Sequence, residues 1–190
     1  MNGRKKVSPV KKAERKREPE GSPSKQWYLF YLWPKAEKSV FNELRKRGYE
    51  VFYPTYRAQR EWRNRQKKVI ELPLFPNYLF VRTYQHELYT IKCLPRIVTY
   101  ISSEGKPSVI SEREIEGIRR MIRLEKKITV EAKFCEGEHV RISTGPLAGY
   151  DGILVRKNGK SRFGIVLKTI NQTAFIDIDA SALEKTDPDL

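Results

Sequence analysis

Hydrophobic and polar positions follow two different periods along the chain, and the first half of the pattern predicts a sheet covered by helices. Residues 27–33 are continuously apolar or aromatic and stop at Pro34, which is typical of a central strand covered on both faces. Apolar residues then recur at helical spacing over residues 36–44, and Gly48 suits the end of that helix. Further strands are predicted over residues 50–57, 69–72, 78–81 and 97–101, with a short helix around residues 88–91.

The last helix of this first unit carries its own start signal. Ser111 and Glu114 have the spacing of a capping box, and Ile115, Ile118 and Met121 follow at helical spacing. Together the elements predict an α+β fold over residues 27–124, an antiparallel sheet sandwiched by helices.

The pattern changes after residue 124. A charged stretch predicts a linker over residues 125–136. Short strands are then predicted over residues 140–142, 152–155, 163–167 and 175–178, separated by turn signals such as the run at 157–160. About 50 residues of closely spaced strands predict a small all-β barrel over residues 137–187, with a core that is thin for independent stability.

Residues 1–26 precede any core-forming pattern. They hold nine Lys and Arg against three Glu, together with three prolines and no Leu, Ile or aromatic residue. Such a segment buries too little apolar surface to offset its chain entropy, so we expect a disordered basic tail. It either scans nucleic acid electrostatically or is a dispensable extension.

The charge balance narrows the class of partner. The 190 residues include 38 Lys and Arg against 23 Asp and Glu, a net charge of +15, which favours nucleic acid, a ribonucleoprotein or an anionic membrane. One basic stretch, residues 57–68, surrounds Trp62 and is predicted to be a protruding hairpin or loop, either nucleic-acid-binding or simply solvated. No stretch approaches the roughly 20 apolar residues that span a bilayer, and no secretory signal is present, so we expect a soluble cytoplasmic protein.

Candidate catalytic and metal-ligating residues are few. Cys93 and Cys135 lie far apart in the sequence, which disfavours a disulfide scaffold or a zinc site. The two histidines, His86 and His139, lie in a polar stretch and a strand-like run, and no Gly-rich phosphate loop is present. We therefore expect no enzymatic activity, no cofactor and no metal.

Several runs resemble the NusG family of transcription elongation factors. Trp27-Tyr28, residues 73–81 (PLFPNYLFV) and residues 94–98 (LPRIV) are similar to its NGN domain. Residues 137–142 (GEHVRI) and 145–152 (GPLAGYDG) are similar to its KOW barrel. The sequence around Asn77 is more similar to specialised paralogues of the RfaH and UpxY type than to the housekeeping factor. The UpxY-type proteins are antiterminators of surface-polysaccharide operons.

This resemblance implies a bacterial, monomeric elongation and antitermination factor. Its NGN domain would bind the clamp helices of RNA polymerase, and its KOW barrel would recruit a small-subunit ribosomal protein or Rho. The residues implied to contact the polymerase are Tyr31, Phe75, Tyr78, Phe80 and Val98. Lys46, Arg47 and Arg96 are implied to contact the non-template DNA strand, and Arg63 and Arg65 of the basic stretch are added as nucleic-acid contacts. The barrel rim that would bind the second partner carries Leu147, Tyr150 and Ile170.

Each of these roles has a structural alternative. The aromatic residues can equally belong to the core, because in an alternating strand one set of side chains faces inward. Lys46 and Arg47 can be a solvated helix end that interacts with the helix dipole, and the rim residues can be ordinary barrel core.

Two other functional classes stay open. A ribosome-associated or general RNA-binding KOW protein would explain the charge and the barrel, but not the aromatic run at residues 75–80. An enzyme acting on nucleic acid would need clustered acids for a metal, whereas the acids here are scattered. A helical hairpin in place of the barrel is disfavoured by the β-rich pattern over residues 163–178.

Overall fold

A five-stranded antiparallel sheet forms the first unit of the protein. The computed structural model describes residues 24–61, 67–126, 128–131, 137–157 and 159–185. The strands are β1 Gln26–Leu32, β2 Glu50–Phe52, β5 Tyr78–Thr83, β6 Ile97–Tyr100 and β9 Val109–Ile110. Their order is β2-β5-β1-β6, and β9 pairs with the start of β1. Strand β1 is central, as its uninterrupted apolar run predicts.

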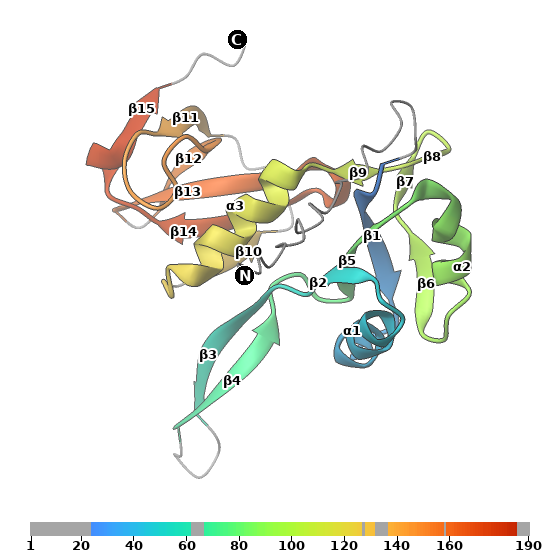
Figure 1. Cartoon of the computed structure of the whole chain (residues 1–190). Helices are drawn as coiled ribbons and strands as arrows, with labels where there is room; N and C mark the ends of the chain where they lie inside the picture. Colours follow the sequence, from blue (N-terminus) through green and yellow to red (C-terminus); the bar gives the residue numbers. More distant parts are fainter. Residues whose placement is uncertain (1–23, 62–66, 127, 132–136, 158, 186–190) are drawn as a thin grey trace, which may run out of the picture.

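Helices cover both faces of this sheet, as expected for an α+β sandwich (Figure 1). They are α1 Glu37–Lys46, α2 Leu88–Lys92 and α3 Glu112–Arg123, and a 3-10 turn, Gln85–Glu87, leads into α2. Side chains alternate along β1, so Tyr28 and Phe30 share a core with α1 and α2. Trp27 and Leu29, on the opposite face, share a core with α3.

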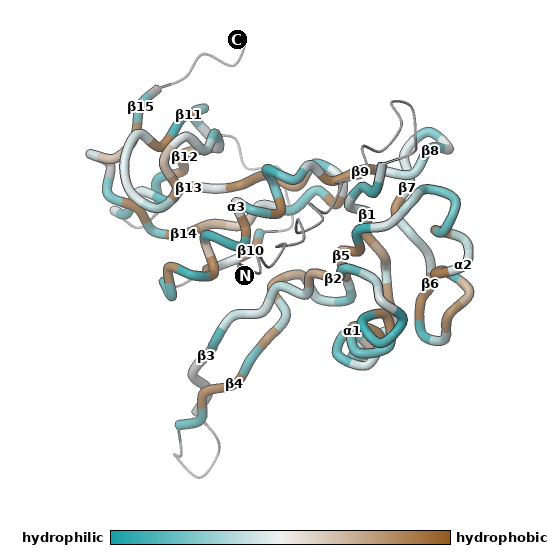
Figure 2. Tube along the Cα trace, in the orientation of Figure 1, coloured by the Kyte–Doolittle hydropathy of each residue, from teal (hydrophilic) through white to brown (hydrophobic). Residues whose placement is uncertain are grey.

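The helix ends lie where the local sequence predicts them. Gly48 follows α1 with a φ of 85°, a left-handed conformation that glycine adopts without steric cost. Ser111 caps α3 by accepting the Glu114 N–H, and the Glu114 carboxylate accepts the Ser111 N–H in return. The amphipathic character of α3 appears in Figure 2 as alternating hydrophilic and hydrophobic segments.

Two small hairpins complete the first unit. Strands β3 Thr55–Glu61 and β4 Lys67–Pro73 pair with each other in a separate two-stranded sheet that projects from the body (Figure 1). This is the predicted hairpin, with strands that extend into the basic stretch. Strands β7 Ser102–Ser103 and β8 Lys106–Pro107 form the second hairpin.

The C-terminal unit, here called the barrel domain, is a six-stranded antiparallel sheet. Its strands are β10 Ile128–Glu131, β11 Glu138–Ile142, β12 Asp151–Lys157, β13 Lys160–Leu167, β14 Gln172–Asp177 and β15 Leu183–Lys185, and its 3-10 turns are Lys168–Ile170 and Ala180–Ala182. The order is β10-β14-β13-β12-β11-β15. Strand β10 lies within the range expected for the linker, yet it pairs with β14 from Ile128 to Glu131. The sheet of the barrel domain therefore begins before residue 137.

Helix α3 lies between the two units (Figure 1). Its buried residues share one continuous apolar cluster with Trp27 of the sheet and with Phe163 and Ile165 of the barrel domain. Gly117 makes this close approach possible: a Cβ atom there would lie 2.6 Å from Ile165 Cδ1 and 3.0 Å from Tyr150 Cε1. The absence of a side chain at Gly117 lets the barrel domain pack against the helix.

Candidate functional site

A pair of tyrosines forms the accessible part of the predicted polymerase-binding surface. Tyr31 on β1 lies directly opposite Tyr78 on β5, and the two ring centroids are 5.4 Å apart. Both side chains are partly exposed. Burial raises the pKa of the Tyr78 phenol above its ordinary value, so the ring remains neutral well beyond physiological pH. The pair offers apolar ring faces together with hydroxyl groups that can form hydrogen bonds.

Phe75 and Phe80 occupy a different environment from the tyrosines. They are 1% and 0% exposed and pack edge to face, with ring centroids 5.8 Å apart. In this structure they are core residues beside α3 and present no surface to a partner. Val98, by contrast, is exposed on the edge strand β6. The five side chains predicted to contact the polymerase are thus divided between surface and core.

A buried carboxylate holds the turn that carries Tyr78. Asn77 has a left-handed φ of 66°, and its N–H donates to Glu37 Oε1 at 2.9 Å. The Asn77 carbonyl accepts the Leu32 N–H at 2.8 Å, which fastens the turn to the end of β1. Glu37 is only 6% exposed although its side chain ends in a carboxyl group. Sequence reasoning missed Glu37, because no local pattern connects it with a residue 40 positions away.

The predicted nucleic-acid contacts lie in separate places. Lys46 ends α1, and the neighbouring Arg47 pairs with Glu43 one turn earlier, Nε to Oε1 at 2.7 Å. Both partners are about half exposed, so this ion pair adds little to stability. Arg96 lies instead beside the end of β1, where its carbonyl accepts the Trp33 N–H at 3.0 Å. Arg63 and Arg65 lie outside the described residues, as do Trp62 and residues 1–23 of the predicted tail. The last residue of that predicted tail, Gln26, is instead the first residue of β1.

The predicted partner-binding rim of the barrel domain is covered by α3. Leu147 is 2% exposed, and the half-buried Tyr150 ring lies between two guanidinium groups of the helix. The Arg113 and Arg120 carbons Cζ are 5.8 Å and 5.1 Å from the ring centroid. Ile170, on a 3-10 turn, is half-buried and packs against the same apolar cluster.

Polar contacts fix this packing between α3 and the barrel domain. Arg113 donates to the Gly149 carbonyl and to Asp151 Oδ2, the latter at 2.7 Å, while Arg120 donates to the Pro146 carbonyl at 3.3 Å. Asp151 also accepts from Arg141 Nε at 2.6 Å. The hydrogen bond from Arg141 and the positive charge of Arg113 lower the pKa of Asp151.

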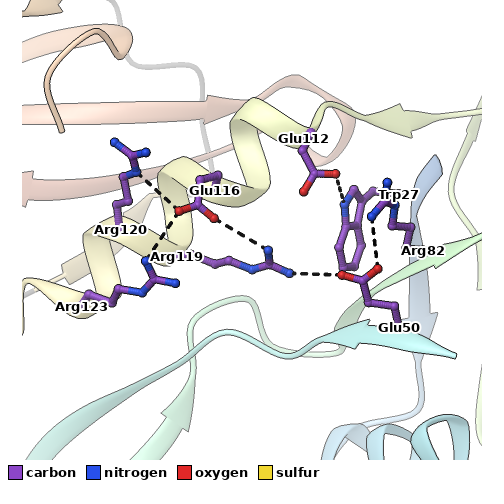
Figure 3. Close-up of polar contacts among 8 residues, drawn as sticks. All are labelled: Trp27, Glu50, Arg82, Glu112, Glu116, Arg119, Arg120 and Arg123. Carbon is purple, nitrogen blue, oxygen red and sulfur yellow. Dashed lines mark hydrogen bonds and ion pairs between the residues drawn. The ribbon is translucent and has the colours of Figure 1, made fainter. Parts of the chain in front are cut away.

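The opposite side of α3 is bonded to the sheet (Figure 3). Trp27 Nε1 donates to Glu112 at 2.8 Å, and the Arg119 guanidinium lies over the Trp27 ring. Arg119 also pairs with Glu50 of β2 at 3.8 Å and with Glu116 at 3.7 Å. Glu116 is shared with Arg120, at 3.4 Å, so a single carboxylate joins the sheet-facing and barrel-facing arginines.

Metal and membrane sites were also sought within the ranges given above. Among those residues, no group of three or more His, Cys, Asp or Glu side chains could hold a metal ion. None of the described helices is long and apolar enough to cross a membrane.

Known proteins resemble this chain over most of its length. The family described as "Transcription termination factor nusG" matches residues 25–119. A "Transcription termination/antitermination protein NusG" from Pseudomonas aeruginosa is 29% identical over 176 residues, covering 85% of this chain and 99% of the relative. The protein of the same name from Escherichia coli K12 is 26% identical over 179 residues, covering 86% and 98%. A solved structure described as "Domain interaction in Thermotoga maritima NusG" shares the fold, with a TM-score of 0.53 and 21% identity, over 88% of this chain and all of that one.

Proposed function

Because this chain belongs to the NusG family of transcription termination and antitermination factors, we propose that it binds RNA polymerase and suppresses pausing and termination. Members of this family are transcription factors and are not known as enzymes. The NGN and KOW architecture of the family agrees with the sheet unit followed by the barrel domain. Such a factor acts in the cytoplasm, where bacterial transcription takes place.

The observation that carries the proposal is the Tyr31–Tyr78 pair. Two aromatic rings, on β1 and β5, are partly exposed at the end of the sheet, beside the turn at Asn77 that Glu37 holds in place. Interface hot spots use such side chains, since they bury a large area and lose little conformational entropy. The clamp helices of the polymerase are the proposed partner of this surface, with Val98 as a further contact at the neighbouring edge. Tighter binding to the closed clamp than to the open one would disfavour the paused state.

Two further contacts belong to the proposal. Lys46, Arg47 and Arg96 are exposed cations that would approach the non-template DNA strand of the elongation complex. The barrel domain would recruit a second protein, a small-subunit ribosomal protein or Rho, through its rim. Because α3 covers Leu147 and Tyr150, this recruitment requires the barrel domain to separate from α3. Regulation of a particular set of operons, those for surface polysaccharides, is the proposed biological role.

A pull-down with purified RNA polymerase at two salt concentrations tests the main claim. We expect the wild type to be retained at both, and the Tyr31→Ala/Tyr78→Ala double variant to be lost. Tyr89→Ala is the matched control, since Tyr89 is 71% exposed on α2, away from the tyrosine pair. Retention of the double variant would refute the surface. Binding of every variant at low salt alone would indicate charge attraction and favour a general RNA-binding protein.

A further inference from the structure

A pocket lies along the seam between α3 and the barrel domain. Its volume is about 490 Å³, within the range of roughly 300–1,000 Å³ that is typical of small-molecule sites. One wall is formed by the first turn of α3, with Arg113 and Glu114, and the other by residues of β11, β12 and β13. The complete pocket therefore exists only while the barrel domain is packed on α3.

The wall that belongs to the barrel domain is largely apolar. Ile153 and Ile165 are each 5% exposed, and Val166 and the Tyr150 ring are half-buried. His139, exposed on β11, completes this wall with a second flat ring. Such a lining offers dispersion contacts and ring faces to a flat apolar molecule, whereas a small inorganic ion would leave it uncovered.

The charge at the rim of the pocket is positive on balance. Two arginines, Arg113 and Arg141, share the single carboxylate of Asp151. The other acid, Glu114, accepts the N–H and the hydroxyl of the residue that caps α3. Lys168, exposed at the start of a 3-10 turn, forms no ion pair with any residue that the structure describes. Lys168 is therefore available to an anion that enters the pocket.

We propose that this pocket binds a small anionic molecule with a flat aromatic body. The body covers Ile153 and Val166, and the anionic group pairs with Lys168 at the rim. Because the ligand contacts both walls, it binds the packed arrangement more tightly than the separated one and shifts the equilibrium toward packing. It thereby opposes the separation of the barrel domain from α3. The site itself goes beyond the proposed function; only its effect on recruitment of a second protein rests on that function.

The charge requirement is tested by fluorescence titration of the full chain with anilinonaphthalene sulfonate, an anionic aromatic probe. Phenylnaphthylamine, which has the same aromatic body without the sulfonate, should bind more weakly. Lys168→Gln should weaken binding of the sulfonate by about 2- to 5-fold, as for loss of one exposed ion pair, and leave the neutral probe unaffected. Lys92→Gln, which removes an exposed cation from α2, is the matched control and should change neither. An equal loss in both lysine variants would show attraction to the overall charge and overturn the site.

The location of the site is tested by filling the pocket. Val166→Phe places a larger side chain in the lining and should weaken binding of both probes by about 5- to 150-fold, the effect of overpacking on the aromatic body. Val69→Phe makes the same change on the projecting hairpin, where Val69 is 61% exposed, and should leave the affinity unchanged. Equal affinity of the wild type and a folded Val166→Phe variant would refute the pocket as the site.

A third measurement uses the wild type alone and so does not depend on any variant folding. At a saturating concentration of anilinonaphthalene sulfonate, hydrogen–deuterium exchange should slow over residues 112–123 and 146–151, whereas α1 should exchange as before. Unchanged exchange in both segments would show that the ligand does not hold the two units together and would overturn the proposal. None of these measurements uses polymerase, so a failure of the polymerase pull-down and a failure of this pocket are distinct results.

Discussion

Replacing Gly117 by alanine should weaken the packing of the barrel domain on α3 while strengthening the helix itself. In a helix interior, alanine is favoured over glycine by about 0.5–1 kcal/mol. The new Cβ would lie 2.6 Å from Ile165 Cδ1 and 3.0 Å from Tyr150 Cε1, well inside van der Waals contact. Ile165 is buried, and the half-buried Tyr150 ring lies against the Arg113 and Arg120 guanidinium groups, so neither neighbour can move away without losing contacts.

The expected effect is a change in the free-energy difference between two arrangements, one with the barrel domain packed on α3 and one with it separated. Overpacking of this kind costs about 1–3 kcal/mol, and the cost applies only while the barrel domain is packed on α3. The helix propensity gain applies in both arrangements and therefore cancels. Gly117→Ala should thus shift the equilibrium toward separation by roughly 5- to 150-fold.

Hydrogen–deuterium exchange is the assay. Peptides covering residues 112–123 and 146–151 should exchange faster in Gly117→Ala, whereas α1 should be unaffected and serves as the internal reference. Adding Ile165→Val removes the clashing Cδ1 atom and should restore part of the protection. If exchange is unchanged and thermal stability simply rises by the helix propensity gain, the packing at Gly117 is not as tight as described and the reasoning fails.

Three further predictions address the contacts around the sheet and α3. Glu37→Ala should lower the free energy of unfolding by about 1–3 kcal/mol, because it leaves the half-buried Asn77 N–H without its acceptor. Urea denaturation measures this free energy, and a loss below about 0.5 kcal/mol would contradict the prediction. The pKa of Asp151 is lowered in the folded protein. The Asp151 carboxylate therefore stabilises the fold above the ordinary carboxyl pKa of about 4, and this stabilisation is lost as the pH falls through the lowered pKa. Asp151→Asn should remove that part of the acid transition when hydrogen–deuterium exchange over residues 146–151 is followed against pH. Arg119→Lys should destabilise the protein by about 1 kcal/mol, because an ammonium group lacks the planar contact that the guanidinium makes with the Trp27 and Phe52 rings. Thermal unfolding measures this, and an unchanged unfolding midpoint would show that only the charge of Arg119 matters.

Local signals in the sequence predicted most of the individual elements. Three such signals are the apolar run of β1, the capping box at Ser111 and the glycine after α1. Each depends on interactions over a few residues, so each can be recognised in the sequence. Strand β10 was missed because its residues pair with β14, more than forty positions away, and its short sequence lies among charged residues. A pairing of that kind leaves no periodic pattern of its own.

The candidate surfaces were predicted less well than the elements. The alternation of side chains along the strand placed Tyr78 and Phe80 on the same face of the sheet. Phe80 lies in the buried part of that face, and Tyr78 lies at its partly exposed end. Phe80 is buried by Phe52, Phe75 and the apolar cluster that includes α3, whereas Tyr78 lies at the margin of that cluster and remains partly exposed. The contact between Trp33 and the Arg96 carbonyl was not foreseen, because the two residues are 63 positions apart.

The sequence by itself determined most of the secondary structure, the order of the two units and the family, because these depend on short-range periodicity, helix caps and sequence motifs. Only the tertiary structure decided which aromatic side chains are accessible, and that α3 is shared between the sheet and the barrel domain. Burial and contact between distant segments depend on how amphipathic faces pair in three dimensions. Gly117 illustrates the difference: in the sequence it is one weak helix residue, and in the fold it is the point where the two units meet.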